Sequence, residues 1–343
     1  MAGKYLVITD KLELELKKMR SEGITKLPSE AELSKKFSCS RQTVRASLDI
    51  LRQKGLIEKR KGSGSYIAGG LIKNRDIFFM TEDCDRYQNP FLINGLKEKL
   101  ASYKYRLKAF STGGSIKGEK DILTRVIEDR PSVLITEPSA DLIPDPNMRL
   151  IEEIEDLGIP VIFCNSSLGT VHAGPDHLSA GRMLMNKLTG KGRKKTACIF
   201  RTDRSSGHDF YRGYIDAVLD SGYEFDESGC LMITHKEEND IISGKDGILS
   251  TFADEIAGSF DSVICHNKVI ACRLMQMLKR KGMSVPEDLD IACFDNTALT
   301  PDTEGMMILE YDMDAFCRSL GMMAAALAEG REAKSFTVPF KPF

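Results

Sequence analysis

The chain has 343 residues, of which 42% are hydrophobic, and its 48 Lys and Arg nearly balance its 50 Asp and Glu, for a net charge of −2. This length and composition predict more than one globular domain with sizeable cores, and they exclude a chain that is mainly disordered. The longest apolar runs, such as 161–164 and 322–326, are far shorter than the ~18–20 residues of a membrane span, so we expect a cytoplasmic protein without a membrane partner.

The nine cysteines include no Cys-x-x-Cys pair, and most of them stand in apolar stretches. Cysteines of this kind behave as small buried hydrophobic groups, so we expect reduced thiols rather than disulfides. The sequence predicts neither a metal site nor a cofactor.

Charge is distributed unevenly along the chain. Residues 1–70 contain 15 Lys and Arg against 8 Asp and Glu, a balance of +7, whereas the remainder has a balance of −9. Local fluctuation is one interpretation. The other is that only the N-terminal segment contacts a polyanion.

The basic segment predicts three helices followed by a hairpin. An amphipathic helix is expected over 8–20, because apolar residues recur there at spacings of three and four. A second helix, about two turns long, begins after Ser29, which forms a capping box with Glu32. The third begins after the N-cap Ser40 and ends at Gly55.

The third helix has an apolar face and a charged face. For one helix alone, a solvated charged face is the simplest interpretation. However, a short capped helix, a tight turn at 38–40 and a second helix with Arg41 in its first turn have the spacing of a helix-turn-helix motif. In that motif the second helix enters the major groove, where arginine binds guanine and threonine contacts a thymine methyl or a phosphate.

The segment LIEKRKGSGSYI, residues 56–67, predicts two short strands around a basic, glycine-containing turn. Glycines let the backbone approach another molecule closely, and the cations neutralise phosphates. This hairpin is expected to act as a wing whose tip reaches the minor groove.

Residues 5–68 resemble the winged helix-turn-helix of the GntR family of bacterial regulators. The elements that carry the resemblance are LPSE, S-R-x-T-V-R and G-x-G-x-Y-I. The resemblance implies a DNA-binding domain over 1–70. It also implies that DNA is contacted by Arg41, Gln42, Thr43 and Arg45 on the third helix and by Lys61 and Gly64 in the wing.

A linker is predicted at 71–76, followed by a second domain over 77–343. From Ile77 onward, apolar strand-like runs alternate with helical stretches in two successive series. This alternation predicts parallel sheets covered by helices and therefore two α/β lobes. Ligands of such folds bind outside the carboxyl ends of the strands, so the cleft between the lobes is the expected pocket.

The second domain resembles the sensor domain of the lactose and galactose repressor (LacI/GalR) family, which is akin to periplasmic sugar-binding proteins. The residues that carry this resemblance are Asn89-Pro90-Phe91, Asp176 with Ala180-Gly181, Arg212-Gly213-Tyr214, Asn267, and VPEDLDIACFDN at 285–296. The stretches 137–147 and 198–207 are similar to the arabinose-repressor branch. The resemblance covers about 76–330 and implies an effector-binding and dimerisation domain of two interwoven lobes, with crossovers near 174–177 and near 295–312.

The resemblance implies an effector site that contains Tyr87, Phe91, Asp176, His208, Phe210, Asn267 and Asp295. Phe210 stands where the family usually has an arginine that binds the sugar, and Lys268 replaces a familiar acidic residue. Loss of an arginine whose guanidinium donates two hydrogen bonds to the sugar is expected to change the ligand. Each residue also has a simpler role: the two phenylalanines as core, the histidine as a solvated side chain, and the two aspartates as helix caps.

Together these features predict a DNA-binding transcription regulator, most simply a repressor, that binds a palindromic operator as a homodimer. A sugar or sugar-derived effector such as L-arabinose would release it from the operator or retain it there. Two other classes stay open: a sugar-modifying enzyme, and a small-molecule-binding α/β protein without regulatory DNA binding. The enzyme is disfavoured because no catalytic triad, metal-ligand spacing or phosphate loop stands out, and GKGRKK at 190–195 lacks the P-loop spacing.

Overall fold

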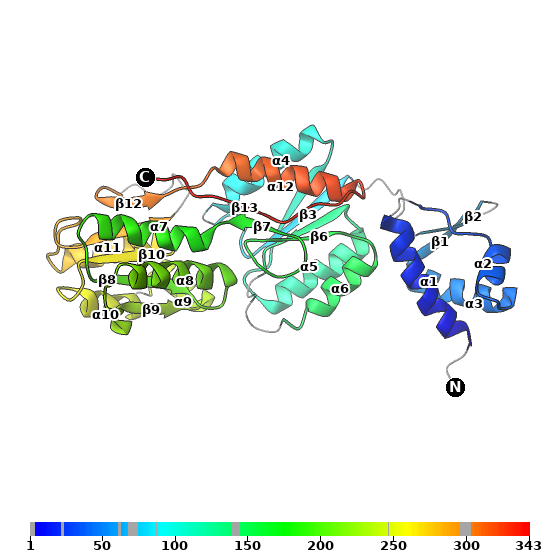
Figure 1. Ribbon diagram of the computed structural model, residues 1–343, viewed down its shortest axis with the longest axis horizontal. Helices are drawn as coiled ribbons and strands as arrows, with labels where there is room; N and C mark the ends of the chain where they lie inside the picture. Colours follow the sequence, from blue (N-terminus) through cyan, green and yellow to red (C-terminus); the bar gives the residue numbers. More distant parts are fainter. Residues whose placement is uncertain are drawn as a thin grey trace.

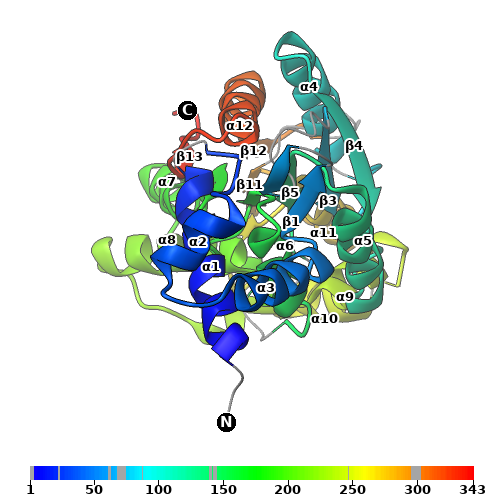
Figure 2. The ribbon, with the colours of Figure 1, turned by 90° about the vertical axis from the view of Figure 1, so that its right-hand side faces the viewer.

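The computed structural model describes residues 4–21, 24–60, 63–67, 75–86, 88–138, 141, 145–245, 247–294 and 303–343. A small N-terminal head and two α/β lobes lie in a row, with the head beside the first lobe (Figure 1). Seen from the end of the head, its three helices lie in front of the body (Figure 2). Among the helices of these ranges, none combines the length and the apolar character that crossing a membrane requires.

The head contains three helices and a two-stranded hairpin around one apolar core. Its elements are α1 (Lys4–Ser21), α2 (Glu30–Lys36), α3 (Arg41–Gln53), β1 (Ile57–Arg60) and β2 (Gly64–Ile67). The predicted caps are confirmed: the Ser29 amide donates to Glu32 at 2.7 Å, and the Thr43 amide donates to the Ser40 hydroxyl at 3.1 Å. Such caps satisfy amides that a helix leaves unpaired at its start.

The first helix begins earlier than its apolar pattern predicts, at Lys4 instead of residue 8. The added turn is fixed by α3, because the Ser47 hydroxyl donates to the Tyr5 carbonyl at 2.8 Å. This contact joins residues 42 positions apart, so it cannot be predicted from the apolar pattern of α1 alone.

The first lobe is built on a six-stranded parallel sheet in the order β13-β7-β6-β5-β3-β4. Helices α4 and α12 pack together on one face, and α5 and α6 on the other (Figure 1). The elements are β3 (Asp76–Thr81), α4 (Asn89–Ser102), β4 (Arg106–Ser111), α5 (Ile116–Asp129), β5 (Val133–Thr136), α6 (Met148–Asp156), β6 (Val161–Cys164), β7 (His172–Pro175), α12 (Met313–Ala328) and β13 (Phe336–Val338). The predicted α/β class is confirmed, and the inner strands β3, β5 and β6 are buried throughout because both faces of the sheet are covered.

The second lobe contains a five-stranded parallel sheet in the order β12-β11-β10-β8-β9. Helices α7 and α8 cover one face, and α9, α10 and α11 cover the other. The elements are α7 (His177–Gly190), β8 (Thr196–Arg201), α8 (Ser205–Asp220), a 3₁₀ turn (Glu227–Gly229), β9 (Cys230–Ile233), α9 (His235–Ile242), α10 (Gly247–Ile256), β10 (Ser262–Cys265), α11 (Lys268–Arg280), β11 (Asp290–Phe294) and β12 (Met306–Leu309).

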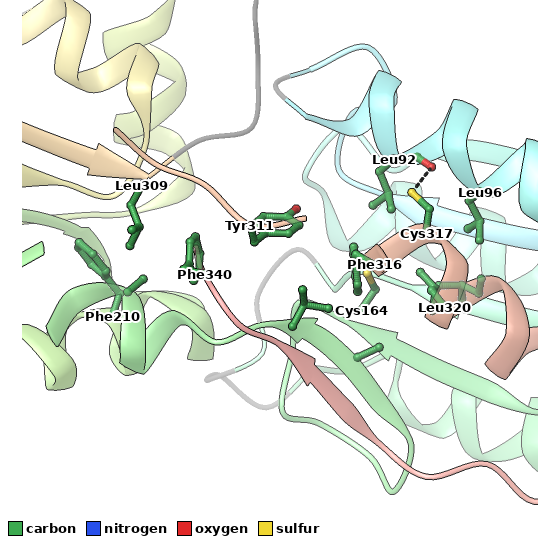
Figure 3. Packing of buried hydrophobic residues seen from close by; sticks show 14 of the residues in the cluster. Leu92, Leu96, Cys164, Phe210, Leu309, Tyr311, Phe316, Cys317, Leu320 and Phe340 are labelled. Carbon is green, nitrogen blue, oxygen red and sulfur yellow. Dashed lines mark hydrogen bonds between the residues drawn. The ribbon is translucent and has the colours of Figure 1, made fainter. Parts of the chain in front are cut away.

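The chain passes between the lobes three times. It leaves the first lobe after β7 to form α7, returns after β12 to form α12, and approaches the second lobe again after β13. On the last passage Phe340 pairs with Tyr311 in a β-bridge and packs against Phe294, with ring centroids 5.6 Å apart. Figure 3 shows the apolar side chains that connect the two lobes here, with Tyr311 between them. The resemblance to the LacI/GalR sensor domain implied only the first two passages, and part of the expected 295–312 crossover lies outside the described residues.

Candidate functional site

The DNA-facing surface expected on the head is the first turn of α3. Arg41 and Gln42 are exposed there, whereas Thr43 is half-buried and its hydroxyl is hydrogen-bonded to the cap Ser40 at 2.8 Å. Arg45 is exposed too, but its Nε donates to a Glu30 carboxylate oxygen at 2.7 Å. Arg41 is therefore the more available of the two arginines for an added acceptor.

The wing is ordered by contacts around one aromatic ring. The Arg60 guanidinium lies 4.3 Å from the ring centroid of Tyr66, whose hydroxyl is 2.6 Å from the Ser63 hydroxyl. Gly64 has φ +110°, a conformation that side-chain-bearing residues rarely adopt. The other expected contact of the wing, Lys61, lies outside the described residues.

A cavity of about 160 Å³ lies between the lobes, at the carboxyl ends of strands from both sheets. The first lobe contributes polar side chains that follow β3, β5 and β6, and the second contributes residues at or just after the ends of β8, β10 and β11. The lining includes Glu82, Glu137, Asn165, His177, Arg201, Arg204, Phe210, Glu238, His266, Asn267 and Phe294. This is the position where open α/β sheets bind ligands.

The wall from the first lobe is a hydrogen-bonded cluster around Glu137. One carboxylate oxygen accepts from the Asn165 side-chain amide at 3.0 Å, and the other accepts a short hydrogen bond from the Thr81 hydroxyl. The Asn89 amide donates to the same hydroxyl at 3.2 Å. Buried polar groups need such partners, so these contacts fix the orientation of the wall.

The wall from the second lobe is centred on Glu238. One carboxylate oxygen lies 2.8 Å from His266 Nε2 and accepts from the Asn267 amide at 2.7 Å, and the other pairs with Arg201. Burial alone would raise the pKa of Glu238, but the hydrogen bond to His266 and the charges of His266 and Arg201 lower it far below its ordinary value. Glu238 is therefore ionised.

Arg204 connects the two walls. Although it belongs to the second lobe, its Nη1 donates to Glu137 at 3.0 Å and its Nη2 donates to Glu82 at 3.2 Å in the first lobe. His235 also reaches across, with Nδ1 2.7 Å from a Glu82 oxygen. Contacts between charged side chains therefore link the two lobes beside the cavity.

Several polar atoms of the lining have no hydrogen-bond partner among the described residues. They are Asn165 Oδ1, His177 Nδ1, Arg201 Nη2, Arg204 Nε and His266 Nδ1. A buried donor or acceptor without a partner costs free energy, roughly 1–3 kcal/mol. The side chains that carry these atoms line both sides of the cavity.

Two family models match the chain. That of the bacterial regulatory proteins of the gntR family matches residues 4–67, and that of the periplasmic binding protein-like domain matches 185–338. The chain is a regulator that combines a head matching the gntR family with a periplasmic-binding-protein-like domain.

Known relatives share this organisation with the regulator. The arabinose metabolism transcriptional repressor of Halalkalibacterium halodurans is 26% identical over 319 residues, covering 89% of this chain and 83% of the relative. That of Geobacillus stearothermophilus is 28% identical over 287 residues, covering 81% and 78%. The fold also matches a periplasmic binding protein/LacI transcriptional regulator from Alkaliphilus metalliredigens, solved with D-xylulofuranose, with a TM-score of 0.65, 17% identity, and coverage of 78% of the regulator and 96% of that structure.

Two of the expected effector residues lie in the lining of the cavity. Phe210 is fully buried and packs against Phe294 with ring centroids 5.2 Å apart, so it forms an apolar side of the cavity as well as part of the core. The Asn267 side chain caps α11 by accepting from the Ile270 amide at 2.9 Å, while its amide group reaches Glu238. Contact with an effector stays a prediction for both.

Three expected effector residues lie outside the lining of the cavity, and the two polar ones have the simpler roles that the sequence analysis left open. The Asp176 carboxylate caps α7, accepting from the Ser179 amide at 3.0 Å and from its hydroxyl at 2.6 Å. His208 is exposed, and its Nε2 lies 2.9 Å from the Thr202 carbonyl oxygen. Phe91 is 39% exposed on α4, outside the lining. Tyr87 and Asp295 lie outside the described residues.

The sequence interpretation missed the charged residues that line the cavity. Glu82, Glu137 and Arg204 each follow a buried strand by one to three residues, in MTED, LITEP and IFRTDR. The same rule that placed the pocket at strand ends would have identified them, because ligands bind outside the carboxyl ends of parallel strands. The resemblance to the LacI/GalR sensor domain implied other positions, such as Asp176 and His208.

His177 is expected to make the stability of the regulator depend on pH. Its ring packs against Phe294 and Phe340, and burial lowers its pKa to about 4. The residue as a whole is only partly buried, but its Nδ1 is shielded from solvent. In the unfolded chain this ring takes up a proton near pH 6.5, so between pH 6.5 and 4 the unfolded state binds more protons. Stability is therefore complete above pH 6.5 and falls as the pH is lowered.

Urea unfolding at pH 7, 6 and 5 measures this effect. Between pH 6.5 and 5 the contribution of His177 should decrease by on the order of 1–2 kcal/mol. The regulator with His177→Gln serves as the reference, since the effects of all other titratable groups are common to both proteins. Parallel pH profiles for the two proteins would contradict the assignment.

Proposed function

We propose that the regulator represses transcription by binding a palindromic operator as a homodimer, and that a neutral sugar in the interlobe cavity controls this binding. L-Arabinose is the first candidate, because the two bacterial relatives described above are arabinose metabolism repressors. Those relatives are repressors and not enzymes, which supports regulation over sugar chemistry. The observation that carries the proposal is the cavity between the lobes, whose two walls hold buried donors and acceptors without a partner among the described residues.

The charges of the cavity favour a neutral ligand over a sugar phosphate. Each arginine in the lining already pairs with a carboxylate: Arg86 with Glu82, Arg201 with Glu238, and Arg204 with both Glu82 and Glu137. A phosphate placed beside them would have to break one of these pairs or lie against a carboxylate, and both are costly in a buried site. Hydroxyl groups can satisfy the remaining donors and acceptors without adding charge.

Thermal unfolding and operator binding test the proposal together. A ligand of the folded state stabilises it by RT ln(1 + [L]/Kd), or about 2.7 kcal/mol at one hundred times Kd. We expect L-arabinose to raise the melting temperature and to change operator affinity at the same concentrations, because coupling between two sites is reciprocal. L-Arabinose 5-phosphate is the control. A shift with the phosphate and none with any neutral sugar would contradict a neutral effector.

A further inference from the structure

Arg204 precedes α8 and extends from the second lobe into the first. Its side chain is only 12% exposed. The side chains of Glu82 and Glu137, whose carboxylates accept hydrogen bonds from it, are only 11% and 10% exposed. Two nitrogens of one guanidinium therefore contact two carboxylates that follow different strands of the other lobe. The planar, rigid shape of arginine suits this arrangement, which lysine cannot reproduce because it is a single point charge.

The ion pairs of Arg204 with Glu82 and Glu137 depend on closure of the lobes, because their members are buried beside each other only in the closed arrangement. Burial alone would lower the pKa of Arg204, but attraction to Glu137 and Glu82 raises it above its ordinary value. Burial likewise would raise the pKa of Glu82, but the close approach of His235 Nδ1 and the charge of Arg204 lower it. Arg204 and Glu82 therefore stay charged, so a structure that buries either one without its partners would be strongly destabilised.

Other contacts cross the gap beside Arg204. The Ser205 amide donates to Asp141 Oδ1 at 2.5 Å, and the Asp141 amide donates to the Asp203 carbonyl at 3.3 Å. His235 packs so closely on Gly114 of the first lobe that a Cβ there would lie 2.1 Å from its Nε2. The closed arrangement thus rests on contacts that the protein makes itself.

The remaining nitrogen of Arg204 links this closure to the cavity. Its Nε is buried without a hydrogen-bond partner in the part of the chain that the structure describes, and Arg204 lines the cavity. An acceptor oxygen in the cavity that binds Nε would fix the plane of the guanidinium and so strengthen both bonds to the first lobe. A neutral hydroxyl or ring oxygen suits this role, because Glu82 and Glu137 already balance the charge.

We propose that Arg204 couples effector binding to lobe closure, with two nitrogens joining the lobes through Glu82 and Glu137 and the third binding an oxygen of a neutral effector. The proposal rests on the proposed function for the identity of the effector, but not for the ligand-free contacts between the lobes. It predicts that these ion pairs keep the unliganded protein largely closed, and that the effector completes a closure that is already favoured.

Small-angle X-ray scattering and calorimetry on the full-length protein test this role. Without ligand, Arg204→Gln should scatter as a more open particle with a larger radius of gyration than the wild type. Binding of L-arabinose should weaken at least tenfold in Arg204→Gln, with partial recovery in Arg204→Lys. Arg212→Gln is the matched control, since Arg212 is exposed on α8, the helix that Arg204 precedes, and lies outside the cavity. The control should match the wild type in both measurements.

Each result decides the proposal. Equal ligand-free scattering of wild type and Arg204→Gln, with sugar affinities within twofold, would overturn it. If Arg204→Gln does not fold, Glu82→Gln keeps the size of the partner and removes its charge, and the same expansion is then required. If the wild type binds no neutral sugar, the proposed effector is wrong, while the ligand-free scattering still decides whether Arg204 joins the lobes.

Discussion

Replacing Arg41 by Ala should weaken specific operator binding by about 1–3 kcal/mol and leave the melting temperature of the regulator nearly unchanged. Arg41 is exposed in the first turn of α3, the part of a recognition helix that contacts base edges. Its removal takes away a guanidinium that can donate two hydrogen bonds to guanine. The fold does not lose a buried group, so stability should be preserved.

Fluorescence anisotropy with operator DNA at one fixed salt concentration measures this loss. Arg52→Ala is the matched control, because Arg52 is exposed at the other end of the same helix and pairs only locally with Asp49 at 3.0 Å. Arg45→Ala should have a smaller effect than Arg41→Ala, since Arg45 must first leave Glu30. Equal losses for Arg41 and Arg52, or a clear drop in melting temperature with Arg41→Ala, would show that α3 does not read DNA through its N-terminus.

Most of the head could be predicted because its signals are local. A capping box spans three residues, so Ser29 and Glu32 identify the start of α2 wherever that helix packs. The early start of α1 could not be predicted in this way. It depends on the bond between Ser47 and Tyr5, which forms only when α1 and α3 are packed together.

The two-lobed α/β body was predictable, but its cavity was predictable only in position. Runs of apolar residues separated by helical stretches indicate a parallel sheet, and the strand-end rule places the ligand. Which side chains meet there depends on how two sheets face each other. Arg204 pairs with Glu82 and Glu137, which are 122 and 67 residues away in the sequence. Asp176, which the family resemblance placed in the effector site, caps a helix.

The third passage between the lobes had no signal in the sequence. The segment after β13 is short and lacks the periodicity of a helix or a buried strand. It is placed by tertiary packing alone, because Phe340 enters an aromatic cluster with Phe294 and Tyr311. Residues brought together from distant parts of the chain carry no local pattern from which such a contact can be predicted.

Replacing Gly213 by Ala should cost about 3 kcal/mol or more of the free energy of unfolding of the second lobe. Helices α7 and α8 touch backbone to backbone at this point, and a Cβ on Gly213 would lie 1.9 Å from the Leu178 carbonyl oxygen. Backbone atoms cannot rotate away as a side chain can, so α8 must shift and disturb Phe210 and Tyr214, which are buried in the core. Overpacking of this kind typically costs 1–3 kcal/mol, and a clash with backbone belongs at or beyond the upper limit.

The same helix pair supplies a control that isolates the steric cause. Gly190 lies at the end of α7 with open space around its Cβ position, so Gly190→Ala should be neutral or stabilise the lobe slightly. Alanine is the better helix former by about 1 kcal/mol in a helix interior, so intrinsic propensity favours both substitutions. A loss of stability in Gly213→Ala alone, measured by urea unfolding, must then come from the contact between the helices.

If Gly213→Ala unfolds at the same urea concentration as Gly190→Ala, α7 and α8 do not pack as closely as the structure shows. Because α8 begins directly after Arg204, the shift should also weaken effector binding, and calorimetry on the Gly213→Ala protein would detect that second effect.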